Sequence, residues 1–115
     1  MQKRKHQYCI AHVTVPNAKL AKKIGEGLVK EKLAACVNIV PEISSIYQWK
    51  GKIAKDKEIL LIIKTTCAMY KKLEQWVLKN HPYEVPEVIC YCVEEGNKKY
   101  LKWIKETVFG RWVKK

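Results

Sequence analysis

The stretch Glu58–Lys64, with the sequence EILLIIK, contains five consecutive aliphatic residues between two charged ones. The lack of alternation between polar and apolar residues indicates a β-strand that is covered on both faces and is therefore central in its sheet. The turn-forming residues Lys50–Lys52 precede it, and before them a second β-favouring segment runs from Cys36 to Trp49. Pro41 within that segment predicts a bulge or a sheet edge. Together these features predict a long β-hairpin.

A strand and an amphipathic helix precede the hairpin. The segment Tyr8–Val15 is rich in β-favouring residues. Apolar residues then repeat at helical spacing from Leu20 to Leu28, which predicts a helix to about Lys32. Gly25 and Gly27 weaken this helix intrinsically by up to roughly 1 kcal/mol each. We therefore expect close helix–sheet packing at these glycines.

A second helix, a fourth strand and a third helix follow the hairpin. The apolar stripe from Met69 to Val77 predicts a helix that ends at Asn80–Pro82, and a rigid loop then leads to the strand Val88–Val93. The third helix is expected to point four residues inward: Tyr100, Leu101, Ile104 and Val108. The order β-α-β-β-α-β plus a helix predicts one α+β, ferredoxin-like domain over residues 1–115. We expect an antiparallel sheet with its helices on one face.

The hairpin is longer than a compact monomer of this plan needs. Its exposed edge presents unpaired backbone groups, which natural proteins cover. A second copy of the chain is the simplest cover, so we expect an oligomer.

The chain is strongly basic, with 23 Lys and Arg against 11 Asp and Glu and a formal net charge of +12. Most of these cations are dispersed, and local concentrations occur only in the terminal segments 1–6 and 110–115. This pattern is typical of a solvated basic surface, with attraction to acidic proteins or membrane surfaces as the alternative. Nucleic acid is not an expected partner, because the sequence shows no basic platform studded with aromatic residues.

The chain has an odd number of cysteines, five, and no two of them have the CxxC spacing. A disulfide framework is therefore not expected, which favours a reducing compartment. The short apolar stretch near the N-terminus lacks a convincing cleavage site, and no run approaches the roughly 20 apolar residues of a membrane-spanning helix. We expect a cytoplasmic protein without a transmembrane segment, and a leader on a longer precursor stays an alternative.

Five long motifs occur in order along the chain: Glu31–Pro41, Ser45–Ile53, Ile63–Thr65, His81–Glu87 and Tyr100–Ile104. In these motifs the sequence resembles the CutA divalent-cation-tolerance family, over about Tyr8 to Glu106. The resemblance implies a homotrimer of ferredoxin-like protomers, similar in architecture to the PII signalling proteins. It also implies a role in tolerance of copper and other divalent cations, with no defined catalysis. Vertebrate relatives are linked to acetylcholinesterase localisation, so a trimeric scaffold is an alternative, as is a PII-like small-ligand sensor.

The metal-ligand pattern of the family is only partly present. Bacterial members carry a cysteine before the first proline motif and a His-His pair before Pro-Tyr, where this sequence has Val13 and Asn80–His81. His81 and Cys36 are therefore the candidate ligands for copper or another divalent cation, because soft thiolates and imidazoles bind copper. Alternatively, His81 bonds a backbone carbonyl at the helix end and Cys36 is a small buried hydrophobe.

A second group of residues combines aromatic and charged side chains. Either these residues are structural, or they line a cleft between subunits that holds a small ligand. No nucleophile–base–orienter set is recognisable, so we expect a binding protein rather than an enzyme. The members of this group are Tyr47, Trp49, Glu58, Lys64, Tyr83 and Glu87.

Overall fold

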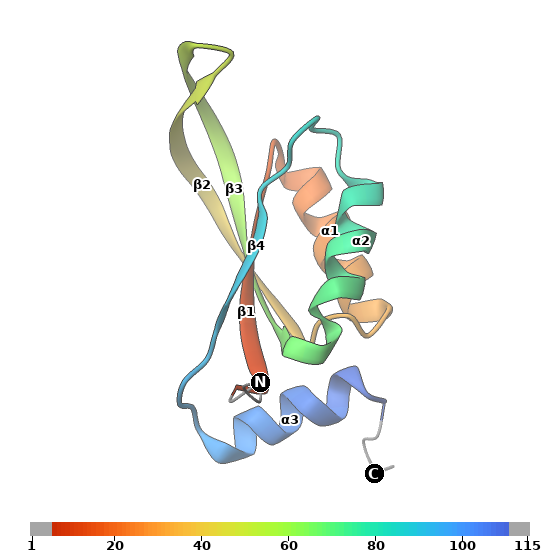
Figure 1. Ribbon diagram of the computed structural model, residues 1–115. Coiled ribbons are helices and arrows are strands. Elements are labelled where there is room, and N and C mark those ends of the chain that lie inside the picture. The colour runs from red at the N-terminus through yellow and green to blue at the C-terminus, as the bar shows by residue number, and fades with distance from the viewer. Residues whose placement is uncertain (1–5, 111–115) are drawn as a thin grey trace.

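The computed structural model describes residues 6–110, and the basic stretches 1–5 and 111–115 of the predicted terminal segments lie outside the described residues. The elements are β1 (Tyr8–Val15), α1 (Ala18–Lys30), β2 (Cys36–Trp49), β3 (Lys52–Thr66), a 3-10 turn (Cys67–Met69), α2 (Tyr70–Asn80), β4 (Val88–Cys92) and α3 (Lys98–Val108). The four strands form one antiparallel sheet in the order β2-β3-β1-β4 (Figure 1). The predicted α+β class and antiparallel sheet are confirmed.

Strand β3 is central, as its aliphatic run predicts, because it pairs with β1 on one side and β2 on the other. Its two faces differ. Leu61 and Ile63 are buried under the helices, whereas Leu60 and Ile62 on the opposite face are only half-buried. The prediction of cover on both faces is therefore wrong for the described part of a single chain. The reason is that α1 and α2 pack on one face of the sheet (Figure 1).

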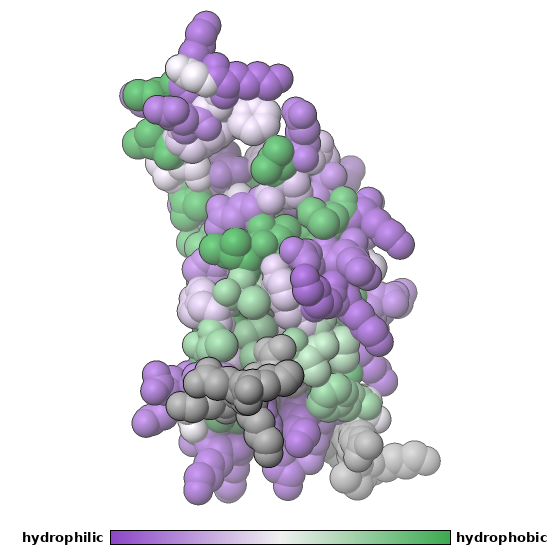
Figure 2. Space-filling model, viewed as in Figure 1, coloured by the Kyte–Doolittle hydropathy of each residue, from purple (hydrophilic) through white to green (hydrophobic). Residues whose placement is uncertain are grey.

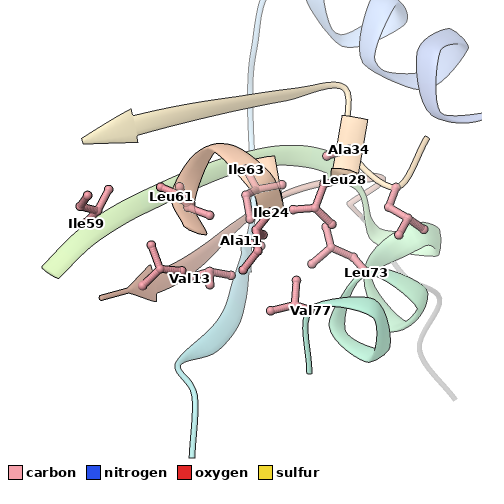
Figure 3. Packing of buried hydrophobic residues seen from close by; sticks show 13 residues of the cluster. Ala11, Val13, Ile24, Leu28, Ala34, Ile59, Leu61, Ile63, Leu73 and Val77 are labelled. Carbon is pink, nitrogen blue, oxygen red and sulfur yellow. The ribbon is translucent and has the colours of Figure 1, made fainter. Parts of the chain in front are cut away.

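The main core lies between the sheet and the first two helices. Figure 3 shows Leu61 and Ile63 of β3 beside Ile24 of α1, with Leu73 and Val77 of α2 closing the cluster. All five side chains are fully buried. The helical spacing on α1 and the strand spacing on β3 thus bring two apolar stripes into contact.

Helix α3 lies across the end of the sheet, apart from the other two helices (Figure 1). Ile104 and Val108 form a smaller cluster there with Ala35. The prediction that Tyr100 points inward is wrong, because Tyr100 is 41% exposed and stacks beside Trp103 with ring centroids 5.5 Å apart. The helical stripe places it at the margin of the buried face.

The β2–β3 hairpin extends well beyond the rest of the sheet (Figure 1). Its register shifts between Val40 and Ile43, which confirms the bulge predicted at Pro41. At its tip Lys50 and Gly51 both have positive φ, 52° and 81°, as a two-residue hairpin turn requires. The turn fixes which residues face one another along the hairpin.

The two glycines of α1 have different neighbours. A Cβ atom at Gly25 would lie 3.4 Å from Val37 of β2, an ordinary contact, as the predicted helix–sheet packing requires. A Cβ atom at Gly27 would lie 2.4 Å from the indole of Trp76, so this glycine serves helix–helix packing instead.

Gly27→Ala is therefore expected to lower the free energy of unfolding by about 1–3 kcal/mol, because overpacking forces Trp76 to move. Gly25→Ala is the matched control and is expected to be neutral or stabilising by up to about 1 kcal/mol, through helix propensity. Urea denaturation measures both values. Equal effects of the two substitutions would contradict the assigned role of the Trp76 contact.

Candidate functional site

A cleft of about 840 Å³ lies at the side of the projecting hairpin. Three parts of the chain line it: the end of β1, both hairpin strands and the loop between α2 and β4. Figure 2 shows apolar surface along the hairpin and over the middle of the visible face, bordered by hydrophilic side chains. The lining residues are Thr14, Pro16, Ser45, Ile46, Tyr47, Trp49, Asp56, Lys57, Glu58, Tyr83, Glu84, Val85 and Glu87.

The cleft concentrates negative charge in a basic protein. Four carboxylates line it, those of Asp56, Glu58, Glu84 and Glu87, against the single cation Lys57. The whole chain carries a net charge of +12, so this local excess of acid is opposite to the rest of the surface. A recess lined mainly by one sign of charge attracts ligands of the other sign. The cleft is therefore suited to a positively charged ligand.

Glu58 is the buried carboxylate of the cleft, with 8% of its surface exposed. The hydroxyl of Tyr83 donates a hydrogen bond of 2.8 Å to Glu58 Oε2 and so links the loop to the hairpin. Burial, together with this bond to Glu58, raises the pKa of the Tyr83 phenol. Tyr83 consequently stays protonated and remains a donor to the carboxylate.

Tyr47 and Asp56 form a second pair on the hairpin, in which the Tyr47 hydroxyl donates to Asp56 Oδ2. This hydrogen bond raises the pKa of the Tyr47 phenol, with desolvation as the next cause. The strand register sets Ser45 opposite Asp56 and Tyr47 opposite Ala54, so Tyr47 and Asp56 are diagonal neighbours on one face. Each of the two acidic hairpin residues that line the cleft is thus held by a tyrosine.

His81 ends α2 and lies next to the cleft. Its Nδ1 accepts a hydrogen bond of 3.2 Å from the Tyr83 backbone N–H. The ring proton is therefore on Nε2, which donates to the Thr14 carbonyl at 2.7 Å. Both ring nitrogens are used to fix the loop against β1, which matches the backbone-carbonyl interpretation of this histidine. A metal ion bound to His81 has to replace one of these two bonds.

Cys36 and His81 are not brought together in one chain. Cys36 pairs with Lys64, and Lys64 pairs with Ile10, whereas His81 bonds Thr14. The distance along β1 between those two points is about 13 Å at roughly 3.3 Å per residue. A site that uses both residues of one chain is therefore excluded by the register.

Five of the six predicted cleft residues do line the cleft, and Lys64 does not. Glu58 and Lys64 lie at opposite ends of the aliphatic run of β3, which is about 20 Å long at roughly 3.3 Å per residue. Within one chain Lys64 therefore lies away from this cleft, and its place in a cleft between subunits stays a prediction. Two residues only six positions apart in the sequence are far apart in space when the chain between them is an extended strand.

Sequence reasoning missed two acidic members of the cleft, Asp56 and Glu84. A signal for Asp56 was present, because a two-residue turn at Lys50–Gly51 sets the pairing that places it near Tyr47. Glu84 lies in the loop after α2, and no periodic pattern fixes where a loop side chain points. Its neighbours Tyr83 and Glu87 offered the only hint.

Within residues 6–110, no group of three or more His, Cys, Asp or Glu side chains is arranged so that it could hold a metal ion. Among the same residues, no helix has both the length and the apolar character needed to cross a bilayer.

The fold and the cleft define a small α+β protein with an acidic, tyrosine-lined recess beside an extended hairpin. The chain belongs to the CutA1 divalent ion tolerance protein family, whose model matches residues 9–107. It is 53% identical over 98 residues to a Protein CutA homolog of Xenopus laevis, covering 85% of this chain and 65% of the relative. It is 51% identical over 96 residues to Protein CutA of Homo sapiens, covering 84% of this chain and 54% of that protein.

The solved structure of the divalent cation tolerance protein from Thermus thermophilus superimposes with a TM-score of 0.85. The two proteins are 45% identical in sequence, and the match covers 87% of this chain and 97% of the other. The chain thus spans nearly all of the bacterial structure, but only about half to two thirds of the two vertebrate proteins.

Proposed function

We propose that this chain is a homotrimeric binding protein that takes a divalent cation, copper or another, in its acidic cleft and has no catalytic role. The observation that carries the proposal is the concentration of four carboxylates around one recess of a strongly basic chain. Carboxylate oxygens bind divalent cations, and tyrosine hydroxyls hold two of these carboxylates in place. The family description, divalent ion tolerance, names the same class of ligand.

A complete metal site requires ligands beyond those of one chain. Glu58 and Glu87 both face the cleft, and His81 lies behind it, but these groups do not converge on one point. In the proposed trimer, a neighbouring copy supplies the remaining donors at the side of the hairpin. The cleft then lies between subunits.

The trimer is supported by the sheet face that the helices leave open. Ile89 and Tyr91 of β4 are 54% and 49% exposed there, and the half-buried Leu60 and Ile62 of β3 lie on the same face on the other side of β1. An apolar face of this kind is typical of a surface that is buried on assembly. The strand order β2-β3-β1-β4 supports a ferredoxin-like protomer, in which the outer strands and the hairpin remain available for pairing between copies.

Titration of Cu²⁺ and Zn²⁺ into the purified protein, followed by calorimetry, tests the metal proposal. We expect saturable binding in the micromolar range or tighter, and a loss of at least tenfold in affinity for Glu58→Gln and for Glu87→Gln. Removing one charged ligand of a metal site typically costs about this much or more. Glu106→Gln, on α3 and outside the cleft, is the matched control and should leave binding unchanged.

Three results would count against the proposal. They are binding only above millimolar concentration, equal loss in the control variant, and no loss in either cleft variant. His81→Ala separates a ligand role from a structural one. If His81 is a metal ligand, the variant binds the metal more weakly but stays folded. If His81 is structural, the variant loses the bonds to Thr14 and Tyr83 and its loop becomes less stable.

A small-ligand sensor is a second candidate, favoured by the aromatic walls of the cleft. Tyr47, Trp49 and Tyr83 line it together with the carboxylates, and aromatic faces next to acids bind organic cations.

A scaffold that presents its basic surface to an acidic protein is a third candidate, and its binding should weaken steeply with salt. A cytoplasmic location is part of the proposal, and the five free thiols support it, since reducing compartments keep thiols unpaired.

A further inference from the structure

The carboxylates of the cleft have no ion-pair partner among the described residues. The ion pairs of this part of the chain lie on α2 and α3, outside the cleft, and Lys57 of the cleft wall is in neither of them. Glu58 is the most demanding case, because only 8% of its surface is exposed. A buried carboxylate is costly unless an opposite charge compensates it. The cleft therefore needs a positive charge that a ligand can supply.

Each of the two hairpin acids keeps one oxygen available for such a ligand. Tyr47 donates to Oδ2 of Asp56, and Tyr83 donates to Oε2 of Glu58. No other hydrogen bond reaches these two carboxylates from the described residues, so Oδ1 and Oε1 have no partner there. Oε1 is not sealed inside the protein, since Thr66 Oγ1 is the one fully buried side-chain oxygen or nitrogen without a partner in the same part of the chain. The tyrosine hydroxyls are neutral, so they orient the carboxylates and leave the negative charge in place.

The spacing of the two hairpin acids suits a linear diamine. Asp56 and Glu58 are two residues apart on β3, so their side chains project from the same face about 7 Å apart, at roughly 3.3 Å per residue. Two ammonium groups joined by four methylene groups are about 6 Å apart in an extended chain with single bonds of about 1.5 Å. The acids of the described residues do not converge on one point as metal ligands would. An elongated cation can therefore meet both acids of a single chain, whereas a metal ion needs the donors of a neighbouring copy.

Apolar and aromatic side chains form the rest of the cleft wall. Trp49 and Tyr83 line it together with Ile46 and Val85. Aromatic faces attract ammonium groups, and the Lys50 ammonium already lies 5.7 Å from the centroid of the Trp49 ring. Methylene groups pack on such surfaces while their charged ends stay with polar partners, as the stems of lysine side chains do. The wall thus matches a ligand with several cationic groups on an aliphatic chain.

We propose that the cleft binds a linear aliphatic polyamine, in which successive ammonium groups pair with Asp56 and Glu58 and the methylene chain lies against Trp49. Glu84 and Glu87 supply negative charge for a further ammonium group. The cleft volume of about 840 Å³ is within the usual range of small-molecule sites. The inference rests on the proposed function only in treating the cleft as a cation site. A polyamine and a metal ion would share Glu58, so each excludes the other.

Calorimetric titration of spermidine into metal-free protein tests the site. The protein is first dialysed against EDTA and then against chelator-free buffer, so that no metal ion contributes to the signal. We expect saturable binding of one spermidine per chain, which weakens as the ionic strength rises. Butylamine has the alkyl chain of 1,4-diaminobutane but only one charge, so it should bind about tenfold more weakly than the diamine, or weaker still, for want of the second charge-assisted pair.

Substitutions separate the roles of charge and aromatic surface. Asp56→Asn and Glu58→Gln should each lower spermidine affinity by about tenfold or more, because each removes one charged partner. Trp49→Leu should lower it by about tenfold through loss of the aromatic face. Glu106→Gln and Trp103→Leu are the matched controls on α3, outside the cleft, and should bind like wild type. Trp103 is 44% exposed and Trp49 is 40% exposed, so the two tryptophan variants lose similar surface.

Four results would overturn the inference. They are no saturable binding of spermidine, equal affinity for 1,4-diaminobutane and butylamine, equal loss in the cleft and control variants, and tighter binding of a tri-lysine peptide than of spermidine. The last would assign the cleft to a protein partner. Spermidine binding without Cu²⁺ or Zn²⁺ binding would contradict only the proposed function. Metal binding without spermidine binding would contradict only this inference.

Discussion

Ile62→Asp is expected to convert the proposed trimer, which has three times the chain mass of 13.4 kDa, into the single chain. Ile62 lies on the open face of β3, paired with His12 of β1 and Asn38 of β2, in the middle of the sheet. A carboxylate buried in an apolar interface costs several kcal/mol. The facing His12 ring is already bonded through Nε2 to the Tyr91 hydroxyl at 3.0 Å. The same carboxylate in a monomer faces water, so the fold of the single chain should survive.

Light scattering on a sizing column measures this change directly. Leu78→Asp is the matched control, because Leu78 is 48% exposed on α2, away from the open sheet face. We expect the control to keep the trimer mass, and Ile62→Val to keep it as well. A wild-type chain that elutes as a monomer, or an Ile62→Asp variant that stays trimeric, contradicts the proposed assembly surface.

The path of the chain was predictable because its signals are local. The aliphatic run of β3, the bulge at Pro41 and the helical stripe from Leu20 to Leu28 each depend on a few neighbouring residues. These predictions hold in the structure because the hydrophobic periodicity and the intrinsic secondary-structure preference of each segment agree with the observed fold. Tyr100 was mispredicted since it lies at the margin of such a stripe, where neighbouring elements decide exposure.

The cleft was only partly predictable, because it depends on contacts between distant segments. Tyr83 and Glu58 meet through a loop and a strand that are far apart in sequence. The group of aromatic and charged residues predicted from the sequence contained both residues, but it also included Lys64, which the extended strand carries away from the cleft. The open sheet face could not be predicted either. A strand with consecutive aliphatic residues has the same sequence pattern whether its second face is covered by its own chain or by another copy.

Two adjacent leucines of the aliphatic run provide the sharpest test of this difference between faces. Leu61 is fully buried against the helices, and Leu60 is half-buried on the open face. Leu61→Ala removes core contacts and leaves a cavity, so we expect the free energy of unfolding to fall by about 2–5 kcal/mol. Leu60→Ala should cost less than about 1.5 kcal/mol in a monomeric background such as Ile62→Asp, where this face meets water.

The two substitutions should also differ in their effect on assembly. Leu60→Ala in the otherwise wild-type chain removes apolar area from the proposed interface, so the trimer should dissociate at higher protein concentration than wild type. Leu61→Ala should leave the concentration at which trimers dissociate unchanged under conditions where it is folded. Sedimentation across a dilution series, combined with urea denaturation, separates the two effects. Equal losses of stability in the monomeric background would mean that both faces of β3 are covered by the chain's own residues, and the case for a partner copy on that face would fail.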